Sequence, residues 1–245
     1  MKQLAIGVLL LGIFTNLQAQ EKMKPEDTEV WSPVPKIVTT DSRNNVPSDA
    51  VTLFDGTSLN AWESAKNKGK ANWTLQEGVF TVKPGEGDIR TKQEFQDYQL
   101  HLEWRSPSVI KGESQGRGNS GVFMQGLYEV QILDNYDNKT YVNGQVASIY
   151  KQRIPLVNAT KKPGEWHTYD IIWTAPRFKK DGTVEKKARI TVLHNGVLAQ
   201  NNVELDGATE YIGIPKYQAH GAGPIVLQDH GDLVSFRNIW IRPLP

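Results

Sequence analysis

Apolar and polar residues alternate in short runs through most of the chain, and turn-forming residues separate the runs. The segment from Tyr98 to Arg105 places Leu100, Leu102 and Trp104 on one face and polar side chains on the other, which is the pattern of a half-buried strand. No amphipathic pattern of three or more helical turns appears beyond the N-terminal region. The alternation therefore predicts an all-β domain at residues 50–245.

The expected strands share this alternation, or are short apolar runs bounded by glycine, asparagine or aspartate. They lie at residues 51–54, 73–75, 79–82, 98–105, 121–124, 128–133, 166–173, 189–194, 197–200, 224–228 and 234–241. Asn-Gly at 195–196 joins two of them, and this pair is a strong hairpin signal. Strands of this length and turn spacing favour two packed antiparallel sheets. No internal repeat is present, which disfavours a propeller or a β-helix.

The N-terminus has the features of a secretory signal. Lys2 precedes an apolar run at residues 4–14, and the small Ala19 suits cleavage by a signal peptidase. The run is too short for a transmembrane helix of the mature protein. Residues 1–20 are thus predicted to be a signal peptide, and the protein is expected to be exported to the periplasm or secreted.

Residues 21–49 are polar, contain several prolines and lack a sustained apolar period. This composition predicts an extended linker, in which Trp31 and Val34 could pack on the domain that follows. The remaining residues are enough for one all-β domain with a sizeable core.

Composition excludes several classes of function. The chain has 28 basic and 27 acidic residues, and no Lys/Arg cluster is interleaved with aromatic residues. Neither nucleic acid nor an anionic membrane surface is therefore an expected partner. There is no cysteine, so disulfides, thiolate metal sites and cysteine nucleophiles are excluded. No Gly-x-Ser-x-Gly motif is present, which disfavours a serine hydrolase.

The most informative strand is the one at 128–133. Val130 and Ile132 can face a core while Glu129 and Gln131 share the opposite face, and Asp134 follows directly after the strand. An acid and an amide side by side suggest a polar cleft of the size of a sugar. An ordinary half-exposed strand of an antiparallel sheet would give the same pattern.

A second polar face follows the apolar run near residue 227. Gln228 and His230 share one side of the chain, and Asp229 points to the other. If this strand and the strand of Glu129 are neighbours in one sheet, a carboxylate and an imidazole meet above it, which suffices for acid/base catalysis near neutral pH. His230 could instead simply close the turn at His-Gly-Asp.

Two loops complete the set of predicted functional residues. The glycine-rich segment 109–119 is either a flexible surface loop or a cleft edge that contributes Arg117 and Asn119. The segment 134–138 is rich in oxygen donors that could hold a divalent cation such as calcium. It lacks the spacing of an EF-hand, so a turn stabilised by its Asp and Asn side chains is the favoured interpretation. No histidine pair has the local spacing of a zinc site.

Several segments together resemble the family of 3-keto-disaccharide hydrolases, which has a concanavalin A-like jelly-roll sandwich. The segments occur in the family order, cover nearly all of the chain after the linker, and lie at residues 53–62, 119–123, 129–134, 163–169, 194–196, 227–231 and 236–239. Related glucanases carry three acids at alternate positions on the active strand. This chain departs from that pattern at Gln131 and Leu133, which leaves Glu129 alone and disfavours displacement by a carboxylate nucleophile.

The resemblance implies a glycoside-cleaving enzyme whose substrates carry a ketone at C3 of the sugar. The ketone acidifies the hydrogen at C2, a base removes it, the C1 leaving group departs, and water adds to the enone. On this hypothesis His230 or Glu129 is the base, and the other helps to protonate the leaving oxygen.

The resemblance also suggests supporting roles. Gln131, Gln228 and Tyr150 would bind sugar hydroxyls, and Asp134 would orient the histidine or hold a cation that polarises the ketone. The expected partners are an oxidised oligosaccharide or glycoside and, functionally, a dehydrogenase that oxidises sugars at C3. A non-catalytic lectin-like binding module and a conventional glycoside hydrolase remain alternatives, because the same sandwich supports both.

Overall fold

The computed structural model describes residues 22–41 and 45–245, so the predicted signal peptide lies outside the described residues. The chain divides into two units, residues 1–37 and 38–245. In the first unit, a 3₁₀ turn, η1 (Pro25–Thr28), interrupts an extended chain, and Trp31 and Val34 are both exposed. Residues 38–49 of the expected linker belong to the second unit, where Thr40 and Pro47 form a β-bridge.

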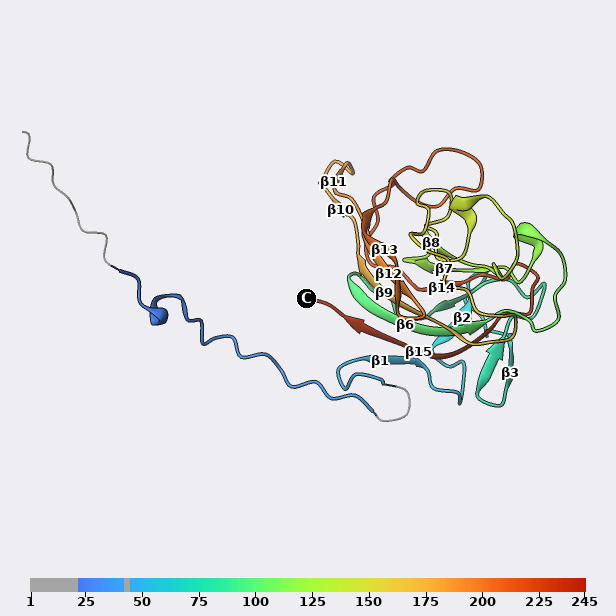
Figure 1. Cartoon of the computed structure of the whole chain (residues 1–245), viewed down its shortest axis with the longest axis horizontal. Helices are drawn as coiled ribbons and strands as arrows, with labels where there is room; N and C mark the ends of the chain where they lie inside the picture. The colour runs from blue at the N-terminus through green and yellow to red at the C-terminus, as the bar shows by residue number, and fades with distance from the viewer. Residues whose placement is uncertain (1–21, 42–44) are drawn as a thin grey trace, which may run out of the picture. The chain divides into compact units, whose positions relative to one another are not determined.

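The second unit is the predicted two-sheet antiparallel sandwich (Figure 1). The larger sheet has eight strands, in the order β13 (Val197–Glu204), β12 (Arg189–His194), β9 (His167–Thr174), β6 (Tyr98–Arg105), β15 (Ser235–Pro243), β4 (Val79–Thr81) and β3 (Thr74–Gln76), with β1 (Val51–Phe54) also paired to β15. The smaller sheet has five, in the order β2 (Trp62–Ser64), β5 (Ile89–Thr91), β14 (Val226–Leu227), β7 (Ser120–Met124) and β8 (Tyr128–Ile132).

Three small elements lie outside the two sheets. A two-stranded ribbon is formed by β10 (Arg177–Phe178) and β11 (Val184–Lys186), and two 3₁₀ turns are η2 (Ser114–Gly116) and η3 (Val142–Gly144). No helix of the described residues is long and apolar enough to cross a membrane.

Every strand expected from the sequence is present, with shifts at the ends. The largest differences are β13, which continues to Glu204, and β14, which is shortened to Val226–Leu227. The strands β2, β5, β10 and β11 were not predicted, because none of them contains an apolar run or an alternation long enough to recognise.

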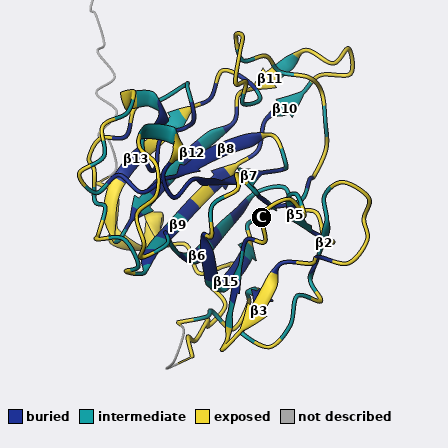
Figure 2. Cartoon of the chain, turned by 90° about the vertical axis from the view of Figure 1, so that its right-hand side faces the viewer, coloured by how far each residue is buried: buried dark blue, intermediate teal, exposed yellow. Residues whose placement is uncertain are grey.

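The core lies between the facing sides of the two sheets. On β6, Leu100, Leu102 and Trp104 point inward and are fully buried, as the alternation predicts. Val130 and Ile132 of β8 face them from the smaller sheet and are equally buried. Figure 2 shows the buried residues following β6, β15 and β8 through the domain. Burial of this apolar surface is the main stabilising contribution to such a fold.

Two histidines form part of this core. His167 and His194 are buried and face each other with their ring nitrogens 2.9 Å apart, and Trp104 stacks on His167 at 4.2 Å. Burial lowers the pKa of His167 to about 4 and that of His194 to about 3. Both imidazoles are therefore neutral near pH 7 and pack in the core as aromatic rings.

A charged cluster on the outer face of the larger sheet holds β6, β9 and β15 together. His101 Nδ1 lies 2.7 Å from Asp170 Oδ1, and Glu103 accepts from Arg237 Nε at 2.6 Å and from Asn238 Nδ2 at 2.9 Å. Burial alone would lower the pKa of His101, but the hydrogen bonds to Asp170 and Glu103 outweigh it and raise that pKa to about 9. The protonated imidazole thus lies between two carboxylates, hydrogen-bonded to Asp170 and 4.0 Å from Glu103 Oε1.

This cluster makes part of the stability pH-dependent. Because the folded-state pKa of His101 lies above the usual histidine value of 6.5, its contribution is complete below about pH 6.5 and is lost as pH rises through about 9. We expect His101→Gln to lower the free energy of unfolding by about 2 kcal/mol at pH 6 and by much less at pH 10. Urea titrations of both proteins at the two pH values measure this, and a cost that does not change with pH would contradict it.

Candidate active site

A cavity of about 600 Å³ lies on the face of the smaller sheet that points away from the core. Most of the residues predicted for the site line it: Glu129, His230, Gln131, Gln228, Tyr150 and Asn119. Glu129 and Gln131 lie on β8, Gln228 and His230 follow β14, and Asn119 and Tyr150 come from the segments before β7 and after η3. Glu129 and His230 are distant in sequence, and the fold brings them to one cavity.

The strand pairing explains this convergence, although β8 and β14 belong to one sheet without being direct neighbours. β7 lies between them, and its Gly121 pairs with Gln131 of β8 on one side. On the other side, Gln228 N donates to Gly121 O at 3.0 Å. Asp229 points away, as predicted, and its Oδ2 accepts from Gly85 N and Gly87 N at 2.8 and 3.0 Å. That contact fixes the chain just before His230.

The absence of a side chain at Gly121 makes room for the acid. A Cβ at this position would lie 2.6 Å from Glu129 Oε1 and 2.9 Å from Phe123 Cε2, both too close for a real contact. The carboxyl group of Glu129 therefore leans across β7 over Gly121. This places it toward the β14 side of the cavity, where Gln228 and His230 lie.

The backbone around Glu129 is held on its outer edge as well. Tyr150 N donates to Glu129 O at 3.2 Å, and Gln131 exchanges backbone hydrogen bonds with Ser148 and Ala147 at 3.0 Å. From the larger sheet, the buried Tyr169 hydroxyl donates to Gln131 O at 2.6 Å. A carboxyl group on such a fully hydrogen-bonded strand has little freedom to move.

Glu129 is only 5% exposed, which changes its protonation. Burial, and to a smaller extent the nearby charge of Asp88, raises the pKa of Glu129 to about 8. The side chain is therefore mainly protonated at neutral pH, unlike an exposed glutamate. A carboxylic acid in this state can donate a proton or a hydrogen bond to a ligand.

Asp88, which immediately precedes β5, is a residue that the sequence analysis missed. Its Oδ1 accepts from Asp229 N at 2.8 Å. Burial raises its pKa, the charge of Asp229 adds to this, and His230 acts in the opposite direction, so Asp88 lies within electrostatic reach of both Glu129 and His230. No sequence signal marked it, because β5 is too short to be recognised and its pairing with β14 is known only from the fold.

Gln131 contacts the acid directly. One end of its amide lies 3.1 Å from Glu129 Oε1 and the other lies 2.9 Å from Gln115 Oε1. With its nitrogen turned toward Glu129, the amide donates to that carboxyl group and to Ser120 O at 3.0 Å. Gln131 is therefore placed to orient Glu129.

Two amide oxygens in the cavity wall have no hydrogen-bond partner among the described residues: Asn119 Oδ1 and Gln228 Oε1. Asn119 is itself well fixed, because its backbone N–H donates to Asp232 Oδ2 at 2.8 Å and its Nδ2 donates to Gln115 O at 2.7 Å. A buried acceptor without a partner is costly unless a ligand satisfies it. Both oxygens are suited to accept from sugar hydroxyls.

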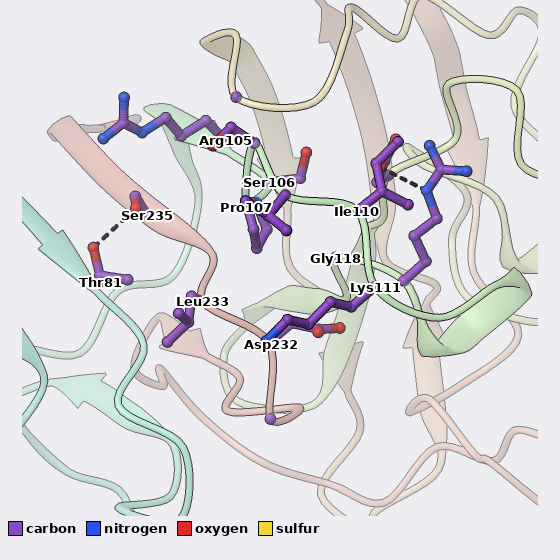
Figure 3. A pocket seen from close by; sticks show the side chains of 16 residues that line it. Thr81, Arg105, Ser106, Pro107, Ile110, Lys111, Gly118, Asp232, Leu233 and Ser235 are labelled. Atoms are coloured by element: carbon purple, nitrogen blue, oxygen red, sulfur yellow. Dashed lines mark hydrogen bonds and ion pairs between the residues drawn. The ribbon is translucent and has the colours of Figure 1, made fainter.

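Arg117 and Asp134 lie elsewhere. They form a buried ion pair, with Arg117 Nε 2.8 Å from Asp134 Oδ2, and they border a second cavity of about 570 Å³. Figure 3 shows this second cavity between Ser106 and Pro107 on one loop and Asp232 and Leu233 on another. Neither Arg117 nor Asp134 lines the cavity of Glu129 and His230.

The segment 134–138 forms the turn that its composition favoured. Tyr136 N donates to Asp134 Oδ1 at 3.1 Å, and Asn138 Nδ2 donates to Asp134 O at 2.7 Å. The Asn135 side-chain oxygen accepts from Val146 N at 2.7 Å. These oxygen donors are thus already used within the protein.

Among residues 22–41 and 45–245, no group of three or more His, Asp or Glu side chains converges as a metal site would. The divalent cation stays a prediction.

The fold and this cavity are those of a carbohydrate-active hydrolase with a β-sandwich domain, and comparison with known proteins defines the class further. Residues 49–242 match the family described as the 3-keto-alpha-glucoside-1,2-lyase-like domain. The chain belongs to this family, which confirms the resemblance seen in the sequence.

Individual relatives agree with this assignment. A 3-keto-disaccharide hydrolase of Bacteroides thetaiotaomicron is 30% identical in an alignment of 290 positions that covers 98% of this chain and 96% of the relative. The crystal structure of a candidate glycosyl hydrolase from Parabacteroides distasonis is 55% identical, covers 91% of this chain and 97% of its own, and superposes with a TM-score of 0.88. Another such structure from that organism is 20% identical, covers 80% of this chain and 94% of its own, and has a TM-score of 0.60, which shows the shared fold.

The space above Gly121 provides a test of the site geometry. We expect Gly121→Ala to displace the Glu129 carboxyl group, to lower the free energy of unfolding by roughly 1–3 kcal/mol, and to lower kcat on any accepted glycoside by roughly 100-fold. Gly116→Ala is the matched control, because Gly116 lines the same cavity and a Cβ there meets nothing within 4 Å. Steady-state kinetics and thermal unfolding of both variants test this. Equal kcat in the two variants would contradict the geometry.

Proposed function

We propose that this protein cleaves glycosides whose sugar carries a ketone at C3, by elimination followed by addition of water. The observation that carries the proposal is that the buried Glu129 and His230 line one cavity, with the Glu129 carboxyl group lying over Gly121. Asp88, the other carboxyl group nearby, does not line this cavity. An acid and an imidazole suit proton transfers, whereas a retaining glycosidase needs two carboxyl groups facing the scissile bond.

The protonation states favour one assignment of roles. With its pKa raised to about 8, Glu129 holds a proton at neutral pH and is the acid. His230 is an exposed imidazole that lines the same cavity, and with Glu129 assigned as the acid it is the base.

In the first half of the reaction, His230 removes the proton from C2, which the C3 ketone has acidified. The electron pair of that C–H bond forms a C1–C2 double bond as the C1–O bond breaks. Glu129 gives its proton to the departing oxygen. The products are an alcohol and an enone.

In the second half, water adds to the enone. Its oxygen bonds to C1 after losing a proton to the ionised Glu129. His230 is exposed, so the proton it took from C2 exchanges with solvent, and a solvent-derived proton is given back to C2. Both side chains then have their starting protonation states, and the net reaction is hydrolysis of the glycoside. Each side chain acts as acid in one half and base in the other.

The remaining cavity residues bind and orient. Asn119 Oδ1 and Gln228 Oε1 accept from sugar hydroxyls, which supplies the partners they lack in the unliganded protein. Gln131 orients Glu129 through the contact at 3.1 Å. The Tyr150 hydroxyl, which lies 2.5 Å from that of Tyr141, is a further contact for the substrate.

The substrate must come from another reaction. A free hydroxyl at C3 does not acidify C2, so a dehydrogenase that oxidises the C3 hydroxyl is the functional partner of this enzyme. If the predicted signal peptide directs export, the two reactions meet outside the cytoplasm.

Substrate dependence separates this proposal from its alternatives. We expect the purified protein to cleave a 3-keto-glucoside and to leave the unoxidised glucoside intact. We expect His230→Ala and Glu129→Gln each to lower the rate by roughly 10²–10⁴-fold, the usual contribution of acid/base catalysis. Product release is followed by chromatography. Cleavage of the unoxidised glucoside would indicate a conventional hydrolase, and binding without cleavage a lectin-like module.

The raised pKa of Glu129 makes the stability of the protein depend on pH, which can be measured without a substrate. Its folded-state pKa of about 8 lies above the usual 4.5, so ionisation costs stability as pH rises from about 4.5 to about 8. We expect Glu129→Gln to be more stable than the wild type at pH 9 by roughly 1–3 kcal/mol, and to lose this advantage at pH 4.5. Denaturant titrations at both pH values test this, and an advantage that is the same at both would mean that Glu129 titrates normally.

A further inference from the structure

Beyond the polar residues around Glu129, the same cavity has an aromatic end. It is lined by Tyr141, Tyr150 and Tyr211. The first two lie close together in sequence, and Tyr211 belongs to a distant segment. Tyr211 is 71% exposed, which is unusual for a side chain that is held in one place by its neighbours. The mechanism proposed above uses none of the three rings for chemistry.

Lys151 holds this aromatic end together. Its Nζ donates to Tyr211 O at 2.5 Å and lies 4.3 Å from the centre of the Tyr211 ring. The same ammonium group lies 5.8 Å from the Tyr141 ring and 5.6 Å from the Tyr150 ring. A cation at these distances from aromatic faces attracts all three rings. The loop that carries Tyr211 is thereby tied to the wall that carries the other two.

The loop is also anchored beside the catalytic strand. Glu129 N donates to Thr209 Oγ1 at 2.9 Å, and Thr209 N donates to Leu127 O at 2.8 Å. Thr209 stands two residues before Tyr211, so the position of the Tyr211 ring is coupled to that of Glu129.

The order of the elements across the sheet shows which part of a substrate this end faces. β7 lies between β14, which leads to His230, and β8, which carries Glu129. The segment of Tyr150 follows on the outer edge of β8, where Tyr150 N donates to Glu129 O. Glu129 therefore lies between His230 and the tyrosines. A sugar whose C2 faces His230 and whose C1 oxygen faces Glu129 directs its leaving group toward the tyrosines.

We propose that Tyr141, Tyr150 and Tyr211 form a leaving-group subsite for the second pyranose ring of a disaccharide, with Lys151 as the positioning residue of Tyr211. This inference rests on the proposed function, because it takes Glu129 as the group that faces the leaving oxygen. The apolar C–H face of a pyranose packs on a tyrosine ring. The tyrosine hydroxyls and the neighbouring backbone can form hydrogen bonds with the hydroxyl groups of the sugar. A single ring fills only part of a cavity of about 600 Å³.

The test compares two 3-keto substrates that differ only in the leaving group, a disaccharide and a methyl glucoside. We expect Tyr211→Ala to lower the preference in kcat/KM for the disaccharide over the methyl glucoside by roughly 3- to 10-fold, mainly through KM. Lys151→Met is expected to change the preference in the same direction. Ile212→Ala is the matched control on the same loop, since Ile212 is 82% exposed and does not line the cavity.

The outcomes distinguish this inference from the proposed function. An unchanged preference in Tyr211→Ala, or an equal change in Ile212→Ala, would overturn the subsite while leaving the reaction intact. If the wild type cleaves neither keto substrate, the proposed function fails. Calorimetric titration with an unoxidised disaccharide and methyl glucoside then decides on the subsite: Tyr211→Ala must weaken binding of the disaccharide more than that of the methyl glucoside, and equal weakening rejects it.

Discussion

The contact between Glu129 and the bare backbone of Gly121 is the constraint on which the site depends. A carboxyl group that leans over β7 loses most of its water, and this loss accounts for most of its raised pKa. The same lean brings it to the side of the cavity that His230 occupies. One missing side chain thus controls both the position and the protonation of the proposed acid.

The rest of the domain keeps that arrangement rigid. β8 is paired with β7 on one edge and with the backbone at 147–150 on the other, and Tyr169 reaches from the larger sheet to bind its backbone. The apolar core and the cluster of His101, Asp170 and Glu103 stabilise the larger sheet from its two faces. Function is then carried by the face of the smaller sheet and by the loops around it, which is common for a site built on a rigid scaffold.

The sequence predicted the sandwich and much of the site because both follow from local patterns. Alternation on β8 separates Val130 from Glu129 and Gln131, and it does not depend on any distant residue. The sequence did not show that β7 separates β8 from β14, because strand order is set by long-range pairing. Asp88 and Tyr211 were missed for the same reason: one immediately precedes a strand of only three residues, and the other stands on a loop that only the fold brings to the cavity.

Arg117 and Asp134 were predicted for the cavity but lie outside it. Their residue types and their nearness in sequence to Asn119 and Gln131 suggested the cavity, but a buried ion pair satisfies both side chains in another place. Charge and position along the chain do not reveal whether a charged group is already paired.

The central claim is that the enzyme removes the proton at C2, and the fate of that proton tests it most directly. The wild-type protein is incubated with a 3-keto-glucoside in deuterium oxide, and the released keto sugar is examined by NMR and mass spectrometry against a control without enzyme. Elimination followed by addition of water predicts deuterium at C2 of the product, above the control. A product that keeps its original hydrogen at C2 while the glycoside is cleaved would contradict the account.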